Sequence, residues 1–310
     1  MNLPSLLYSL ILISNLLFPV LKDNIYYQPF SSSPVDSESE ATYGVSKTRT
    51  PVFNSLSALR QLSSNNYLNQ NHLFTAVEFA AFPGTVFKLG KITTTDKVKL
   101  VQVETDEYEC NNCYLPLEFL DLYSVKPPAR AVPLFPPGKI LAKLQTLAKI
   151  STRYCWGCNF PEGIPRLVEL LKLPVENSKP NHHQLQKGVD CSGLLYYATY
   201  GFTPRNTSQL LEFGRSLPIS NLSARQIKAL LQPLDLILWK GHVIIVLDQN
   251  TLLESANKIS GKLIQKVIQS SSIERLKQIM HSRKPVDNYH GSPLASKNKF
   301  AINRWHPWIN

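Results

Sequence analysis

The chain has 310 residues, of which 43% are hydrophobic and 18% are charged, and its formal net charge is +11. This balance excludes an intrinsically disordered chain, and the length allows two domains with sizeable cores. Residues 257–310 carry much of the excess charge, with ten Lys and Arg against two acidic residues. Such a basic face suits a polyanion, or it is simply a solvated surface. No zinc-finger spacing or aromatic RNA-binding motif accompanies it, so we expect no nucleic-acid partner.

The first 22 residues predict a targeting segment. The run from residue 3 to residue 21 is apolar, long enough for the hydrophobic part of an export signal and marginal for a membrane span. A buried core helix is the weaker alternative, because Pro4, Pro19 and a polar tail flank the run. We therefore expect residues 1–22 to be an export signal, cleaved or retained as a membrane anchor. The protein would then act in the periplasm or cell envelope.

Two further segments precede the most informative part of the chain. Residues 23–50 are polar and rich in Ser and Thr, which predicts a flexible spacer. Residues 51–126 then change to short runs of β-forming residues separated by turn residues, which predicts a small β-barrel domain. The runs are residues 74–79, 85–89, 98–104 and 114–120.

A proline-rich linker separates this β-domain from the rest of the chain. Residues 126–137 hold five prolines, so we expect an extended, stiff linker over residues 127–137. From residue 138 the pattern becomes helical, with apolar residues recurring at helical spacing between Ile140 and Ala148. Residues 138–310 are therefore predicted to form a second domain.

The stretch from Gly188 to Tyr197 carries the first candidate for chemistry. Asp190 directly precedes Cys191, and an apolar run follows. Aspartate is a good helix N-cap, so the sequence predicts a short buried helix with Cys191 in its first turn. The positive end of a helix dipole favours the thiolate, which is the nucleophilic form of cysteine. The alternative is that Cys191 is a small buried apolar residue, as many lone cysteines are.

A candidate base lies downstream. Residues 231–246 predict a turn followed by two buried strands, and His242 opens the second strand. If that strand forms a hairpin with residues 251–255, His242 and Glu254 are near neighbours on one face. A cysteine nucleophile needs a base and a group that orients the base, so we expect these two residues to serve Cys191. The alternative is that Glu254 is a solvated residue at a strand end.

Five motifs follow one another in the second domain: Tyr154-x-Trp156-Gly157, Asp190-Cys191-Ser192-Gly193-Leu194, Pro204-Arg205, Pro233-x-Asp235-Leu236 and Gly241-His242-Val243. Their order resembles the NlpC family of cell-wall cysteine peptidases, which are papain-like in fold. The resemblance implies an α+β catalytic domain in which the helix bearing the cysteine packs on an antiparallel sheet. By pattern alone, residues 51–126 resemble the bacterial SH3-like domains that often precede such peptidases.

The resemblance also implies roles for individual residues. Cys191 matches the nucleophile and His242 the base, whereas Glu254 stands where the family usually has His, Asn or Gln. Tyr154 matches a tyrosine whose hydroxyl helps to polarise the scissile carbonyl. Asp190 matches an acidic residue that binds the amino group of free muropeptides. Further substrate-binding residues are expected at Ser192, Arg205 and Trp156, although ordinary packing would equally explain Tyr154 and Arg205.

The other four cysteines form two C-x₂-C pairs, at residues 110 and 113 and at residues 155 and 158. They could make a four-thiolate zinc site, remain free, or form disulfides, which an exported protein favours. Because the pairs fall in different predicted domains, cross-domain disulfides or a shared metal would lock the β-domain over the active site.

Together these expectations describe an exported bacterial endopeptidase that cleaves peptidoglycan stem peptides. The resemblance implies the γ-D-glutamyl–diamino acid bond as its target, an acyl-enzyme on Cys191, no cofactor or catalytic metal, and a monomer. Two alternatives stay open: an amidase or acyltransferase on the same fold, and a catalytically inactive wall-binding protein.

Overall fold

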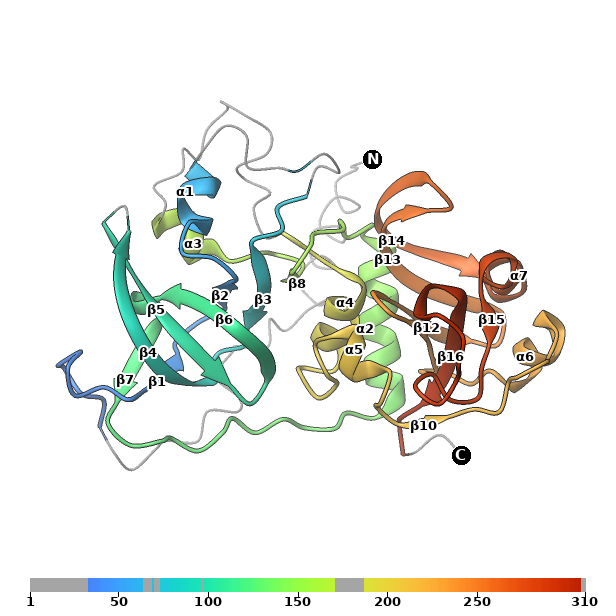
Figure 1. Ribbon diagram of the computed structural model, residues 1–310, viewed down its shortest axis with the longest axis horizontal. Helices are drawn as coiled ribbons and strands as arrows, with labels where there is room; N and C mark the ends of the chain where they lie inside the picture. Colours follow the sequence, from blue (N-terminus) through green and yellow to red (C-terminus); the bar gives the residue numbers. More distant parts are fainter. Residues whose placement is uncertain (1–32, 64–68, 70–72, 96, 171–186, 308–310) are drawn as a thin grey trace, which may run out of the picture.

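The computed structural model describes residues 33–63, 69, 73–95, 97–170 and 187–307. Two large, mainly antiparallel sheets lie side by side, and most helices gather around the second sheet (Figure 1). The fold is therefore mixed α+β, as predicted. The predicted export segment lies outside the described residues. In the part of the chain that is described, no helix is long and apolar enough to cross a membrane.

The first sheet has seven strands in the order β3–β2–β6–β5–β4–β1–β7, and every pairing is antiparallel. Its elements are β1 (Tyr43–Ser46), β2 (Thr50–Phe53), α1 (Ala58–Ser63), β3 (Val77–Ala81), β4 (Val86–Thr95), β5 (Val98–Thr105), β6 (Tyr108–Pro116), η1 (Leu117–Phe119) and β7 (Leu120–Tyr123). The sheet curls around its own apolar core, to which Phe87, Val101 and Leu115 contribute (Figure 1). Burial of these side chains is the main force that holds the unit together.

The boundary predicted for this unit was wrong. The spacer was expected to run through residue 50, but β1 lies inside it and pairs with both β4 and β7. A strand of four residues in a Ser- and Thr-rich segment has too little apolar periodicity to be recognised. By contrast, the run at residues 98–104 falls within β5, and the run at residues 85–89 overlaps the start of β4.

The second sheet has the order β10–β16–β11–β12–β13–β14, and β15 pairs in parallel with β16. Its strands are β10 (Arg215–Ser216), β11 (Leu236–Trp239), β12 (His242–Asp248), β13 (Thr251–Ile259), β14 (Lys262–Ser271), β15 (Lys284–Pro285) and β16 (Lys299–Arg304). Strand β16, from the far end of the chain, lies between β10 and β11. This long-range pairing gives the predicted β11–β12 hairpin a neighbour that no local pattern indicates.

Helices cover both faces of the second sheet (Figure 1). The helical elements are α2 (Pro137–Lys149), α3 (Pro165–Leu170), α4 (Cys191–Ala198), α5 (Thr207–Leu210), α6 (Ala224–Leu230), α7 (Ser272–Ser282) and η3 (Ser296–Asn298). Side chains of α2 and α4 share one core cluster with Val243 and Ile245 of the sheet. Side chains of α6 and α7 share another with Ile244 and Val246, because successive strand residues point to opposite faces.

Helix α4 begins where the sequence predicts. Asp190 is its N-cap, with Oδ1 accepting from the backbone N–H of Gly193 at 2.6 Å. The helix is buried on nearly every side, which fits its apolar composition. Its end is closed by Gly201, whose φ of +82° is a conformation that glycine adopts readily and whose N–H donates to Tyr196 O at 2.8 Å. The short strands β8 (Asn159–Phe160) and β9 (Gly188–Val189) pair just before it.

The two units are joined by an interface beside α4. Asn159 donates to and accepts from the backbone of Ala80 in β3, at 2.9 and 3.0 Å. The linker residue Arg130 forms three hydrogen bonds with Glu107, which also accepts from the Tyr196 hydroxyl. A shared apolar cluster that includes Phe82 and Tyr196 completes the contact. The first unit is thus fixed directly against the segment that leads to Cys191.

Candidate active site

The structure brings Cys191 and His242 together from the two elements predicted to carry them. Cys191 opens α4 and is a free, buried cysteine, and its Sγ lies 3.9 Å from the carbonyl oxygen of Gly241. His242 is the next residue and opens β12. The thiol and the imidazole are close enough to interact, because Cys191 contributes to the raised pKa of His242. A potential nucleophile and a potential base therefore face each other at the junction of the helix and the sheet.

Glu254 lies on the other side of the imidazole. Its Oε2 accepts from His242 Nε2 at 2.8 Å, and its side chain is fully buried. The β12–β13 register pairs Ile245 with Leu253, so Glu254 is a diagonal rather than a direct neighbour of His242. Because a carboxylate can only accept, Nε2 carries the proton and Nδ1 is left to face Cys191. The proximity expected from the hairpin is thus present, and the catalytic roles remain predictions.

A fourth residue, Arg275 of α7, extends this chain of contacts. Its Nε donates to Glu254 Oε1 at 2.7 Å and its Nη2 to Oε2 at 3.0 Å. Such a two-pronged pair fixes the plane of a carboxylate as well as its position. Arg275 is itself 8% exposed, and α7 packs on the sheet through Leu276 and Ile279. The carboxylate that orients His242 is therefore anchored by a second element of the fold.

These contacts set the charge states of the site. Burial alone would lower the pKa of His242, but the interactions with Cys191 and Glu254 raise it to about 9. Burial alone would raise the pKa of Glu254, but the hydrogen bonds from His242 and Arg275 lower it. At neutral pH the imidazole is thus protonated and Glu254 ionised, which is the charge arrangement that stabilises a neighbouring thiolate.

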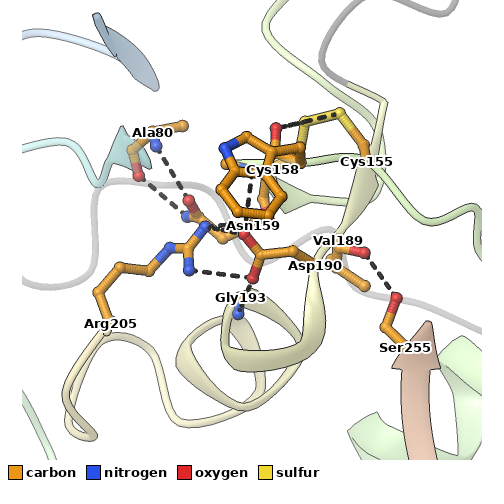
Figure 2. Close-up of a disulfide and its surroundings, with 11 residues drawn as sticks. Ala80, Cys155, Cys158, Asn159, Val189, Asp190, Gly193, Arg205 and Ser255 are labelled. Atoms are coloured by element: carbon orange, nitrogen blue, oxygen red, sulfur yellow. Dashed lines mark hydrogen bonds and ion pairs between the residues drawn. A yellow bond between two sulfur atoms is a disulfide. The ribbon is translucent and has the colours of Figure 1, made fainter. Parts of the chain in front are cut away.

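The strand before Cys191 is fastened to the strand that carries Glu254. The hydroxyl of Ser255 donates to the carbonyl of Val189 at 2.7 Å, and both residues are buried (Figure 2). Val189 is the last residue of β9, two positions before the cysteine. This hydrogen bond holds the start of α4 against β13, so it helps to set the separation between Cys191 and His242.

Asp190 is enclosed by donors (Figure 2). Arg205 donates from Nη1 to Oδ1 at 3.0 Å and from Nη2 to Oδ2 at 2.6 Å. The backbone N–H of Gly193 donates to Oδ1, and that of Gly157 donates to Oδ2 at 3.0 Å. Ser192 completes the group, because its hydroxyl donates to Oδ1 at 3.3 Å and accepts from Arg205 at 2.8 Å.

This geometry gives three predicted substrate-binding residues a different position from the one expected. Asp190, Ser192 and Arg205 are 8%, 4% and 2% exposed, so they lie beneath the N-terminus of α4 rather than on an open surface. The charge of Asp190 is already matched by the guanidinium. The expectation that Asp190 binds a substrate ammonium does not fit an enclosed, paired carboxylate, because the ammonium would have to displace a buried partner. The three residues instead hold the start of α4, and with it Cys191, in place.

Tyr154 and Trp156 lie nearer to the surface. Tyr154 is partly buried, and burial together with the charges of Asp190 and Cys191 raises the pKa of its hydroxyl, which therefore stays a hydrogen-bond donor at neutral pH. Trp156 is 46% exposed, in the loop between α2 and β8. Their positions are compatible with contact to a substrate, and these two roles also remain predictions.

The paired cysteines form disulfides within each C-x₂-C motif, Cys110–Cys113 in β6 and Cys155–Cys158 beside the site. The favoured expectation of disulfides is confirmed, but the bridges do not cross between the two units. Each disulfide closes a short loop within its own motif. The two units are connected instead by the hydrogen bonds between Asn159 and Ala80 (Figure 2). With all four sulfurs in disulfides, the alternative of a four-thiolate zinc site is not realised.

Arg275 is a site residue that the motifs do not indicate, since the sequence places it only within the basic C-terminal region. A signal was present, because Ser272, Leu276 and Ile279 recur at helical spacing and form the buried face of α7. Arg275 stands on that face, and a buried arginine requires an anionic partner. The identity of that partner depended on how α7 folds back over β13, which local pattern does not reveal.

A comparison with protein-family models finds none that matches this chain, and a search among curated proteins finds no similar sequence. The site itself consists of a free cysteine at a helix N-terminus, a histidine beside it, and a buried carboxylate held by an arginine.

Proposed function

We propose that this protein is an exported bacterial cysteine endopeptidase that hydrolyses peptidoglycan stem peptides at the γ-D-glutamyl–diamino acid bond. One observation carries the proposal: Cys191 at the start of α4 lies beside the Gly241–His242 segment, and Glu254 orients His242 through a 2.8 Å hydrogen bond. The choice of substrate rests on the resemblance of the five motifs to the NlpC family. Neither a cofactor nor a catalytic metal is part of the proposal.

The reaction would proceed through an acyl-enzyme. The thiolate of Cys191 attacks the scissile carbonyl carbon, and negative charge moves to the carbonyl oxygen, near the N-terminus of α4 and the Tyr154 hydroxyl. The imidazolium of His242 then gives its proton to the amide nitrogen, and the C–N bond breaks to release the amine. Water, deprotonated by His242, attacks the thioester, and the acid product leaves the regenerated cysteine.

Several features support the wider assignment. A helix bearing the nucleophile, packed on antiparallel strands, supports a papain-like catalytic domain over residues 138–310. The curled seven-stranded sheet supports an SH3-like domain before it. Two disulfides suit an oxidising compartment, so the periplasm or cell envelope is the proposed location, with residues 3–21 as export signal or anchor. The protein is proposed to act as a monomer, with no nucleic-acid partner.

The test is turnover of purified muropeptides by the full chain, with products identified by mass spectrometry. Release of a diamino acid peptide from a γ-D-glutamyl product supports the proposal. Hydrolysis of a different amide bond with the stem peptide left intact identifies an amidase, and transfer of an acyl group to an added amine or alcohol acceptor identifies an acyltransferase. No product at any pH between 5 and 10, from protein that binds the muropeptides, identifies an inactive wall-binding protein.

A further inference from the structure

A pocket opens beside His242 on the face of the second sheet that α7 covers. Its volume is about 340 Å³. Its lining comes from the end of β11, the start of β12, the end of β13 and the following turn, and α7 with its C-cap, and it includes Trp239, His242, Lys258, Arg275, Ser282 and Arg283. The proposed reaction gives a role to His242 and, through Glu254, to Arg275, but it leaves the rest of this lining unexplained.

The lining of the pocket is strongly cationic. Lys258, Arg275 and Arg283 contribute to it, and among the described residues that line it none is acidic. Glu254 is the nearest carboxylate in the site, but its side chain is fully buried and is already bonded to Arg275 and His242. Glu254 thus offsets the charge of Arg275, whereas no ion pair within the described part of the chain offsets that of Arg283, so an anion is the complementary ligand of the pocket.

Arg283 is the residue most available to such an anion. Its guanidinium lies over the ring of Trp239, 4.6 Å from the centroid, which fixes its plane. It donates from Nη1 to the hydroxyl of the neighbouring Ser282, while its buried Nε has no hydrogen-bond partner. No carboxylate in the described part of the chain pairs with it. A preorganised guanidinium with an unsatisfied donor is well suited to bind a carboxylate.

The pocket is positioned to receive the leaving group. His242 lines it, and the imidazole packs against Trp239 with 4.9 Å between ring centroids. In the proposed reaction His242 protonates the departing amine, so the residue that leaves must lie against this imidazole. The residue that carries the departing amine therefore lies next to the pocket, because both contact the His242 imidazole.

We propose that this pocket binds a carboxylate of the residue released as the leaving amine, with Arg283 as its principal ligand. The inference rests on the proposed function, and it narrows the substrate to stem peptides whose leaving residue bears a free carboxylate. That carboxylate is either the C-terminal one of a tripeptide or the second carboxylate of diaminopimelate. A leaving residue with both groups amidated is the disfavoured case.

Binding can be measured without turnover by calorimetry on the Cys191→Ala protein. The probes are L-alanyl-γ-D-glutamyl-diaminopimelate and the same tripeptide with both diaminopimelate carboxylates amidated. The free peptide should bind roughly 10-fold more tightly, a difference of about 1.4 kcal/mol, because its carboxylate forms charge-assisted hydrogen bonds that the amide cannot form. Arg283→Gln in the same background should remove the difference, and Arg283→Lys should restore part of it. A tripeptide that ends in lysine identifies which carboxylate is bound.

Lys277→Gln is the matched control, because Lys277 is an exposed cation of the same helix, paired with Glu274 and outside the pocket. It should leave both affinities unchanged. Equal affinity of the Cys191→Ala protein for the two peptides, or absence of binding, would overturn the pocket assignment. Absence of hydrolysis by the wild-type protein would instead overturn the proposed function, so the two failures are distinguished. Melting temperatures of the Arg283 variants show that they are folded.

Discussion

Arg275 and Glu254 form a buried, two-pronged ion pair, with Nε–Oε1 and Nη2–Oε2 distances of 2.7 and 3.0 Å. The same carboxylate accepts a hydrogen bond from His242. It therefore lies between two cationic groups and neutralises part of the charge of each. Arg275 holds the carboxylate in place, and it also limits how far the carboxylate raises the pKa of the imidazole. Substitution of Arg275 and substitution of Glu254 should therefore shift the pKa of His242 in opposite directions.

Cys191→Ala should abolish hydrolysis of muropeptides and leave the fold intact, because the change removes only a sulfur from the first turn of α4. Product formation by mass spectrometry measures the loss, and circular dichroism checks the fold. In the wild-type protein, iodoacetamide should label Cys191 ahead of the other cysteines, all of which are in disulfides. Hydrolysis that persists in the alanine variant would exclude the cysteine-peptidase mechanism.

Glu254→Gln keeps an acceptor for His242 but removes the negative charge, so it should retain partial activity. Glu254→Ala removes both and should reduce kcat by roughly 100-fold or more with little change in KM, because orientation of the base matters chiefly in the transition state. Steady-state kinetics on one muropeptide separate the two parameters. A near-native kcat in the alanine variant would show that Glu254 does not orient the base.

Arg275→Met should lower kcat and shift the alkaline limb of the pH–rate profile upward. With the guanidinium removed, the full charge of Glu254 acts on His242 and raises its pKa further. Glu254→Gln should shift the same limb downward, toward neutral pH. If Arg275 has only a structural role, Arg275→Met should lower the stability of the protein and leave the alkaline limb of the pH–rate profile where it is. Breaking a buried ion pair costs about 3–5 kcal/mol of stability, so Arg275→Met is partly destabilised. Arg275→Lys keeps the positive charge and should be more stable, so it is measured alongside.

Much of this site could be predicted from the sequence, because its parts lie in locally encoded elements. Asp190 before an apolar run indicates the start of α4, and the strand pattern with its turn brings Glu254 near His242. Arg275 could not be placed, because its contact with Glu254 depends on the packing of α7 over the sheet. The enclosure of Asp190 by Arg205 was likewise missed, because it requires two loops to meet beneath the helix.

The first unit shows a similar division. Strands β4 and β5 are long and have a clear apolar pattern, so the sequence analysis located them. The short β1 was taken for spacer, since its stability comes from its two neighbours rather than from its own residues. The disulfide pairing also depends on tertiary context, because four cysteines allow three connectivities and spacing alone does not choose among them.

The stability of the protein should fall as the pH rises from about 6.5 to about 9. His242 has a raised pKa of about 9 in the folded state, so its contribution is complete below its unfolded pKa and is lost as the pH approaches 9. The loss should be on the order of 1–3 kcal/mol. Urea unfolding at a series of pH values measures it. The His242→Gln variant should show a clearly smaller decline, and an equal decline in both proteins would contradict the assignment.

The final prediction concerns Arg205, whose guanidinium neutralises Asp190 beneath the nucleophile. Arg205→Met should destabilise the protein by about 3–5 kcal/mol, because it leaves a buried carboxylate without its partner. Asp190→Asn with Arg205→Met removes both charges and should recover much of that lost stability. A double-mutant cycle followed by urea unfolding measures this coupling.

If Asp190 instead serves chiefly to bind a substrate ammonium, Arg205→Met should leave stability nearly unchanged. It should then also tighten the binding of peptides with a free amino terminus, because the competing cation is gone. Affinity for the free and the N-acetylated tripeptide, compared between Cys191→Ala and Cys191→Ala with Arg205→Met, separates the two roles.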